Sequence, residues 1–225
     1  MDIYSQTSYR GYNINIYYDE NPMNPRTDIE NLGTIYTAHR RYRPEEEFDK
    51  HFNINEVFDG RLGNFSDSFS QKYVALPIYL YDHSGITIST SPFSCPWDSG
   101  FYGIIAVSLE KVRQEYGWKS VTRKRREQIE KYLQGEIDEL DDYYTGQVFR
   151  YDLIDVDTKE KIDSCSGFFG TGGIEEIESE CKAMINNIKA VYKQEHFRYL
   201  MNKFKRGVQL CIPFSAYPNI DLAID

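Results

Sequence analysis

A thiol, an imidazole and a carboxylate occur close together near the middle of the chain, as Cys95, His83 and Asp98. A cysteine nucleophile needs a neighbouring base to take its proton and a third group to orient that base. These residues flank a predicted hairpin, whose two ends approach each other, so they could fill the three roles in a hydrolase or transferase. No cysteine-protease or nucleophile-elbow motif accompanies them, and a packed corner beside Cys95 is the alternative interpretation.

Most of the negative charge lies in one segment of the chain. The net charge is -9, but residues 134–181 hold 14 acidic and 3 basic side chains, whereas residues 182–225 carry a net charge of +4. Glu136, Glu139 and Asp142 recur at three-residue steps of a predicted helix, which places their carboxylates roughly 5–7 Å apart, on the scale of phosphates along a DNA strand. An ordinary solvated helix face is the alternative interpretation.

The acidic segment predicts a surface that binds a basic partner. Asp155 and Asp157 share one face of a predicted strand and extend the array. The predicted contact residues are Glu136, Asp138, Glu139, Asp141, Asp142, Asp155 and Asp157, with Tyr143 and Tyr144 as aromatic anchors.

Two basic clusters support a third interpretation, a nucleotide or nucleic-acid binder. Arg40, Arg41 and Arg43 follow a predicted strand, and residues 123–126 place four cations at the start of a predicted helix, where they oppose the helix dipole. The negative field of the whole chain argues against nucleic acid as the main partner.

No cofactor or metal ion is predicted. The histidines are isolated from one another, and the glycine-rich residues 167–173 lack the Gly-Lys-Ser/Thr ending of a phosphate-binding loop. Four cysteines without a Cys-x-x-Cys pair, and a start that lacks the features of a signal peptide, indicate reduced thiols in the cytoplasm. No apolar run approaches the roughly 20 residues that span a bilayer, so no membrane association is expected.

The hydrophobic pattern predicts an α+β fold, with a mainly antiparallel sheet, two or three packed helices and a helical C-terminal extension. We expect a core domain over residues 1–193 and an extension over 194–225 with a short strand at 208–212. A long loop with phenylalanine anchors is expected over 44–72, and a break in the last helix near Glu195 and His196. The predicted strands are 11–18, 32–39, 74–81, 86–90, 103–107, 146–156 and 161–169, and the predicted helices begin near Ser108, Thr122 and Ile174.

Two segments of the chain resemble a set of uncharacterised proteins from bacteriophages and mobile elements. They are 81–87, Tyr-Asp-His-Ser-Gly-Ile-Thr, and 92–100, Pro-Phe-Ser-Cys-Pro-Trp-Asp-Ser-Gly. Segments 31–34, 39–42 and 163–170 fit the same pattern, so the resemblance covers residues 11–170. It implies no catalytic role. It implies a context in which small acidic proteins inhibit host defences, as anti-restriction and anti-CRISPR proteins do.

Charge and resemblance together give the leading hypothesis. The protein is expected to be a non-enzymatic inhibitor whose acidic, phosphate-mimicking surface binds a host defence nuclease or nucleic-acid-binding complex. The expected partner is a host defence protein with a basic groove. The enzyme that uses Cys95 remains the first alternative, and the nucleic-acid binder the second.

Overall fold

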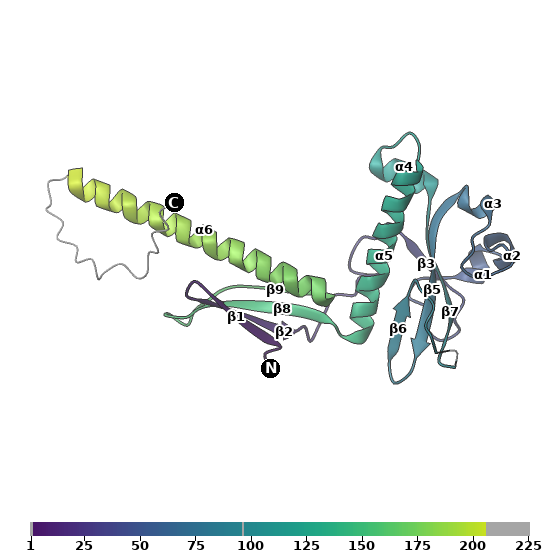
Figure 1. Cartoon of the computed structure of the whole chain (residues 1–225), viewed down its shortest axis with the longest axis horizontal. Helices are drawn as coiled ribbons and strands as arrows, with labels where there is room; N and C mark the ends of the chain where they lie inside the picture. The colour runs from purple at the N-terminus through teal and green to yellow at the C-terminus, as the bar shows by residue number, and fades with distance from the viewer. Residues whose placement is uncertain (1, 96, 206–225) are drawn as a thin grey trace. The chain divides into compact units, whose positions relative to one another are not determined.

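The computed structural model describes residues 2–95 and 97–205. The chain divides into two compact units, Met1–Glu178 and Ser179–Asp225. The first unit holds two mostly antiparallel sheets with helices packed against one of them (Figure 1), and the predicted α+β class is therefore confirmed.

The four-stranded sheet joins the N-terminal hairpin to a later hairpin, in the order β1-β2-β8-β9 with all neighbours antiparallel. Arg10 and Gly11 turn the first hairpin with positive φ angles of 48° and 83°, the backbone that a tight two-residue turn requires. The second hairpin turns at residues 157–160, as predicted. The strands are β1 (Ser5–Tyr9), β2 (Tyr12–Tyr18), β8 (Val148–Asp155) and β9 (Lys161–Phe169).

The five-stranded sheet has the order β4-β3-β7-β5-β6, and only the β3–β4 pair is parallel. Pro77 lies in the part of β5 that pairs with β7 alone, because β6 pairs only with Tyr79–Asp82. The register with β7 shifts just after it, between Ile78 and Tyr79. Both predicted settings, an edge position and a bulge, therefore occur at or beside Pro77. The strands are β3 (Thr34–Thr37), β4 (Glu46–Glu47), β5 (Tyr73–Asp82), β6 (Ile86–Ser89) and β7 (Ser99–Ser108).

Two helices cover one face of the five-stranded sheet. Helix α4 (Leu109–Tyr116) begins at the N-cap Ser108 and ends at Gly117, and α5 (Arg123–Thr145) begins at the N-cap Thr122. Both starts agree with the predicted helices. The core of this face consists of buried aliphatic side chains from α5 and the strands, chiefly Ile129, Leu133, Ile137, Leu140, Ile35, Val74 and Ile105.

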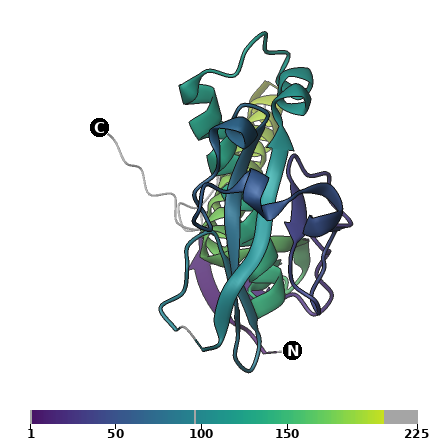
Figure 2. The same cartoon turned by 90° about the vertical axis from the view of Figure 1, so that its right-hand side faces the viewer.

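The segment 44–72 lies on the face of this sheet opposite to α5 (Figures 1 and 2). A cluster of mostly aromatic side chains packs there. The predicted loop over 44–72 contains three helices of four residues each, α1 (Phe48–His51), α2 (Ile54–Val57) and α3 (Asp67–Ser70). The expected phenylalanine anchors do pack together, because Phe48, Phe58 and Phe69 are buried against Ile104 and Ala106 of β7. Strand β7 is therefore buried on both faces.

Helix α6 (Gly170–Lys205) spans the end of the first unit and the start of the second. The predicted break near Glu195 and His196 was wrong, since the helix continues through both residues. No glycine or proline lies between residues 174 and 205 to interrupt it. The apolar period slips there because Val191 and Phe197 are more than half exposed, so no packing fixes their spacing. The expected strand at 208–212 lies outside the described residues.

Candidate functional site

Glu136, the first of the predicted contact residues, is buried and holds two parts of the chain together. Its side chain receives N–H groups from Leu32 at 2.7 Å and Gly33 at 3.2 Å, and Arg26 Nη1 lies 2.9 Å from Glu136 Oε2. Arg26 also pairs with Glu45. Because Glu136 is only 6% exposed, it cannot touch a partner, and its expected role as a contact residue is corrected to a structural one.

A groove next to this buried pair gathers part of the predicted acidic surface. It has a volume of about 690 Å³ and is formed by residues 29–31, one face of α5, the end of β9 and the first turns of α6 up to Glu176. We call it the acidic groove. Its carboxylates are Glu30, Asp138, Glu139, Asp142 and Glu176 around the buried Glu136, its lysine is Lys131, and its apolar lining is Ile29, Tyr132, Phe168 and Phe169.

Burial and crowding raise the pKa values of two carboxyl groups in the groove. Burial, and then the charges of Asp141, Asp138 and Glu139, raise the pKa of Asp142 to about 6. Burial and the charge of Glu136 also raise the pKa of Glu139. Burial is the larger cause of both raised pKa values, and the neighbouring carboxylates add to it, so a cation that entered the groove would stabilise the ionised forms.

Replacing Asp142 by asparagine is expected to increase the free energy of unfolding by about 1 kcal/mol at pH 7 and to leave it unchanged at pH 4. The native carboxyl binds its proton more tightly than the unfolded one, so this contribution to stability is complete below the unfolded pKa and is lost as the pH rises through about 6. Urea unfolding of both proteins across this pH range measures the difference.

The matched control for this experiment is Asp157→Asn, at an exposed turn position. The raised pKa of Asp142 would be contradicted if Asp142→Asn were no more stable than the parent protein at pH 7. It would also be contradicted if the gain in the free energy of unfolding persisted at pH 4.

Other predicted contact residues have separate local roles. Asp141 accepts the N–H of Ile88 at 2.7 Å and so covers the outer edge of β6. Asp155 accepts the N–H of Asp157 at 2.9 Å and stabilises the β8–β9 turn. Tyr143 and Tyr144 pack against the core.

The acidic residues therefore do not form one array. Asp155 lies seven residues along β8 from Val148, which at ~3.3 Å per residue is roughly 23 Å from the end that joins α5. Of the predicted contacts that can be reached from outside, Asp138, Glu139 and Asp142 line the groove. Sequence reasoning missed Glu30 and the groove's other side, since only the tertiary fold brings residues 29–31 and 167–176 to α5. It also missed Tyr132, which lies on α5 itself.

The three candidate catalytic residues are close together, but in an order that does not suit a nucleophile. His83 Nδ1 lies 3.2 Å from Asp98 Oδ2, and Cys95 Sγ lies 4.0 Å from the same oxygen. A nucleophilic cysteine requires the imidazole between the thiol and the carboxylate. Here the carboxylate lies between them, and among the described residues no hydrogen bond joins His83 to Cys95.

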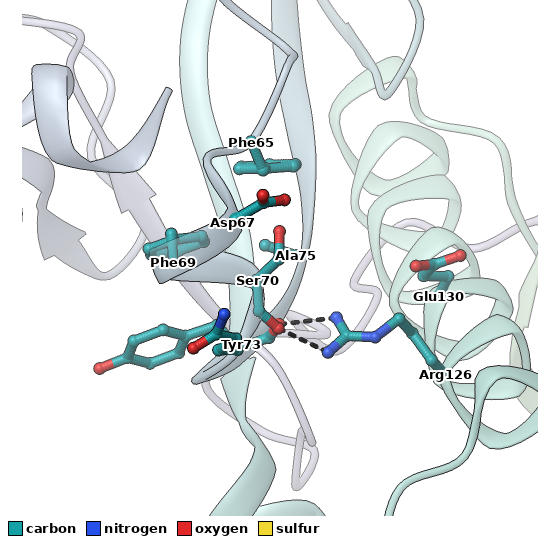
Figure 3. Close-up of a pocket in the computed structure, with 9 residues that line it drawn as sticks. Phe65, Asp67, Phe69, Ser70, Tyr73, Ala75, Arg126 and Glu130 are labelled. Carbon is teal, nitrogen blue, oxygen red and sulfur yellow. Dashed lines mark hydrogen bonds between the residues drawn. The ribbon is translucent and has the colours of Figure 1, made fainter. Parts of the chain in front are cut away.

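The basic cluster at residues 123–126 is used largely within the fold. Arg126 donates to the carbonyl oxygens of Ser70 at 2.6 Å and Tyr73 at 2.8 Å, across a pocket of about 360 Å³ between α5 and α3 (Figure 3). Arg125 lies 4.5 Å from the ring of Trp118. Only Arg123 and Lys124 remain exposed, and Arg123 pairs with Glu127 at 3.1 Å.

Among residues 2–95 and 97–205, no three His, Cys, Asp or Glu side chains are placed to hold a metal ion. No described helix combines the length and apolar character needed to cross a membrane. Comparisons of the chain with protein-family models, curated proteins and solved structures found no match, so its function has to be argued from its own residues.

Proposed function

We propose that the protein is a non-enzymatic binding protein whose acidic groove engages a basic segment of a partner protein. The observation that carries the proposal is the concentration of carboxylates in one concave site, with a single lysine among the lining residues. The raised pKa of Asp142 is consistent with it, because burial and then the negative charges of Asp141, Asp138 and Glu139 disfavour its ionised form, which a bound cation would stabilise. Arginine or lysine side chains that enter the groove would pair with these carboxylates.

The concave shape favours a projecting partner over the basic groove expected from the sequence. Phe168 and Phe169 at the end of β9, together with Tyr132 on α5, give the groove apolar walls. The aliphatic stems of arginine and lysine can pack against such walls while their charged ends reach Glu139 and Asp142. A basic loop or helix from the partner therefore fits this site best.

An inhibitory role against host defence is the biological context that we propose for this binding, in the cytoplasm of the host cell. A nuclease or nucleic-acid-binding complex presents basic residues where phosphates normally bind. A basic loop or helix of such a protein could pair with Asp138, Glu139 and Asp142, of which the first two each lie about one turn of α5 from the third. Once held in the groove, that loop or helix could no longer bind nucleic acid. The Cys95 hypothesis has no comparable support, since His83 pairs with Asp98.

A labelled peptide of about eight alternating arginine and lysine residues is expected to bind the protein in about 50 mM salt and to be released in about 0.5 M salt. The double variant Glu139→Gln, Asp142→Asn should weaken this binding about tenfold, because it removes two carboxylates from the groove. Fluorescence anisotropy of the peptide measures both effects.

The matched control removes two negative charges elsewhere, at Asp157 and Glu160 in the exposed turn of the β8–β9 hairpin. Equal weakening by the control and the groove variant would mean that the peptide senses net charge rather than the groove, and the proposal would fail. A nuclease inhibited by the protein should likewise regain activity with the groove variant and stay inhibited by the control.

A further inference from the structure

One end of the five-stranded sheet brings together two sequence motifs that lie outside the acidic groove, the arginine cluster after β3 and the histidine turn after β5. The chain leaving β3 carries His39 and the arginine cluster, and the turn after β5 carries His83. Between them opens a pocket of about 370 Å³. Its lining residues are His39, Leu80, Asp82, Trp97, Asp98, Ser99, Gly100 and Phe101.

Aromatic rings at this end are available for stacking. Trp97 lines the pocket and is 91% exposed, the most exposed of the large hydrophobic side chains in the described residues. His39, also in the lining, stacks on Tyr42 with ring centroids 5.3 Å apart and planes within 5°. An indole left almost wholly in water contributes nothing to the core, and its ring is open to a ligand that enters the pocket.

The pocket's two carboxylates each have a neighbour of opposite or titratable charge, so with a neutral His83 the charges of Arg40, Arg41, Asp82 and Asp98 cancel. Asp82 lies 3.8 Å from Arg41 Nη1 and accepts the hydroxyl of Tyr42 at 3.3 Å. Asp98 pairs with His83. Arg40 is exposed, and no ion pair among the described residues includes it.

We propose that this end of the sheet, the Trp97 site, binds single-stranded nucleic acid, with a base stacked on Trp97 and the backbone phosphates at Arg40 and Arg41. An exposed aromatic ring beside cations is the arrangement that grips unpaired strands, because every base has a face to stack and every nucleotide a phosphate. A pocket of this volume admits a base that has left its stack, whereas the bases of a duplex are not exposed in that way.

This site is independent of the acidic groove. It lies where β5 turns into β6 and β7 begins, and it shares no lining residue with the groove. The chain's net charge of -9 argues against nucleic acid only if the charge is spread evenly. Phosphates respond to charges within a Debye length of about 10 Å. The charges of Arg40, Arg41, Asp82 and Asp98 cancel, so this site does not share the negative excess of residues 134–181, and stacking on Trp97 provides the main attraction.

The experiment uses a fluorescein-labelled oligothymidylate of about twelve nucleotides and the full chain, in about 50 mM salt. Trp97→Ala is expected to weaken binding at least fivefold, the lower end of what one stacked base contributes. The double variant Arg40→Ala, Arg41→Ala should lower the salt dependence, the slope of log K against log salt, by about 1.4, or ~0.7 for each lost phosphate contact. Anisotropy titrations at several salt concentrations give both numbers.

Two controls separate the Trp97 site from general charge effects. The double variant Arg123→Ala, Lys124→Ala removes the same charge at exposed positions on α5 and should keep the parent affinity within about twofold. The groove variant Glu139→Gln, Asp142→Asn should also bind the oligonucleotide as the parent does, so the outcome here does not depend on that of the peptide experiment.

The proposal is overturned if the oligonucleotide does not bind in low salt, or if Trp97→Ala binds it as tightly as the parent. It is also overturned if a duplex of the same length or free thymidine monophosphate binds as tightly as the strand, because the site would then read charge or a single nucleotide. Trp97 is exposed, so its removal should leave the thermal midpoint unchanged, and that measurement excludes unfolding as the cause.

Discussion

Replacing Arg26 by methionine is expected to lower the free energy of unfolding by about 3–5 kcal/mol, because it strands buried carboxylates without a countercharge. The Arg26 side chain is 1% exposed and contacts Glu136, Glu45, the amide oxygen of Asn31 and the carbonyl oxygen of Gly33. A methionine fills much of the same volume but donates no hydrogen bond. Urea unfolding at pH 7 measures the loss.

Two further variants show whether burial sets the size of this effect. Glu136→Gln keeps an oxygen that accepts the Leu32 N–H and should cost less, about 1–2 kcal/mol. Arg123→Met breaks an exposed ion pair with Glu127, in which the arginine is 94% exposed, and should change stability by no more than ~0.5 kcal/mol. A loss below ~1 kcal/mol for Arg26→Met would contradict the structural role assigned to the pair.

The sequence contains a signal for the burial of Glu136, but the acidic repeat obscures it. Glu136 lies three residues after Leu133 and beside Ile137, and both of these side chains are fully buried. The apolar stripe of α5 therefore includes position 136, and a carboxylate there requires a partner. That partner, Arg26, is 110 residues away in an irregular segment, so no local pattern could identify it.

Local signals were most informative where the structure depends on local contacts. The caps Ser108 and Thr122 each accept a backbone N–H three residues ahead, and Gly117 adopts a φ of 63°, as their residue types predict. The helices α1, α2 and α3 were missed because four residues carry no period. Contacts among their phenylalanine rings, such as the 5.5 Å pair of Phe52 and Phe69, hold them instead.

The candidate sites required information that the sequence pattern does not carry. Asp138 and Asp142 were predicted on α5, but the other wall of the acidic groove comes from the end of β9, and sheet register decides its position. The proximity of His83 and Asp98 was expected from a hairpin, and the structure adds that the carboxylate faces both the imidazole and Cys95. The residue types therefore predicted that a thiol, an imidazole and a carboxylate would lie near one another, but only the fold shows that the carboxylate lies between the other two.

Replacing Gly103 by alanine is expected to destabilise the protein by about 3 kcal/mol or more, because the new methyl group would collide with the neighbouring strand. Gly103 is a buried residue of β7, paired with Thr37 of β3 on one side and Ile78 of β5 on the other. A Cβ there would overlap the carbonyl oxygen of Tyr36 and lie 2.9 Å from the Cα of Thr37. Backbone cannot rotate away as a side chain can, so β3 would have to separate from β7.

The same substitution at Gly135 supplies the matched control for this prediction. Gly135 lies inside α5, and a Cβ there meets nothing within 4 Å, so Gly135→Ala should stabilise the protein by about 0.5–1 kcal/mol through helix propensity. Thermal unfolding of the two variants should therefore shift in opposite directions from the parent. If both alanines were tolerated equally, the close β3–β7 approach at Gly103 would be incorrect, and with it the position of β3, whose preceding residue Gly33 contacts Glu136.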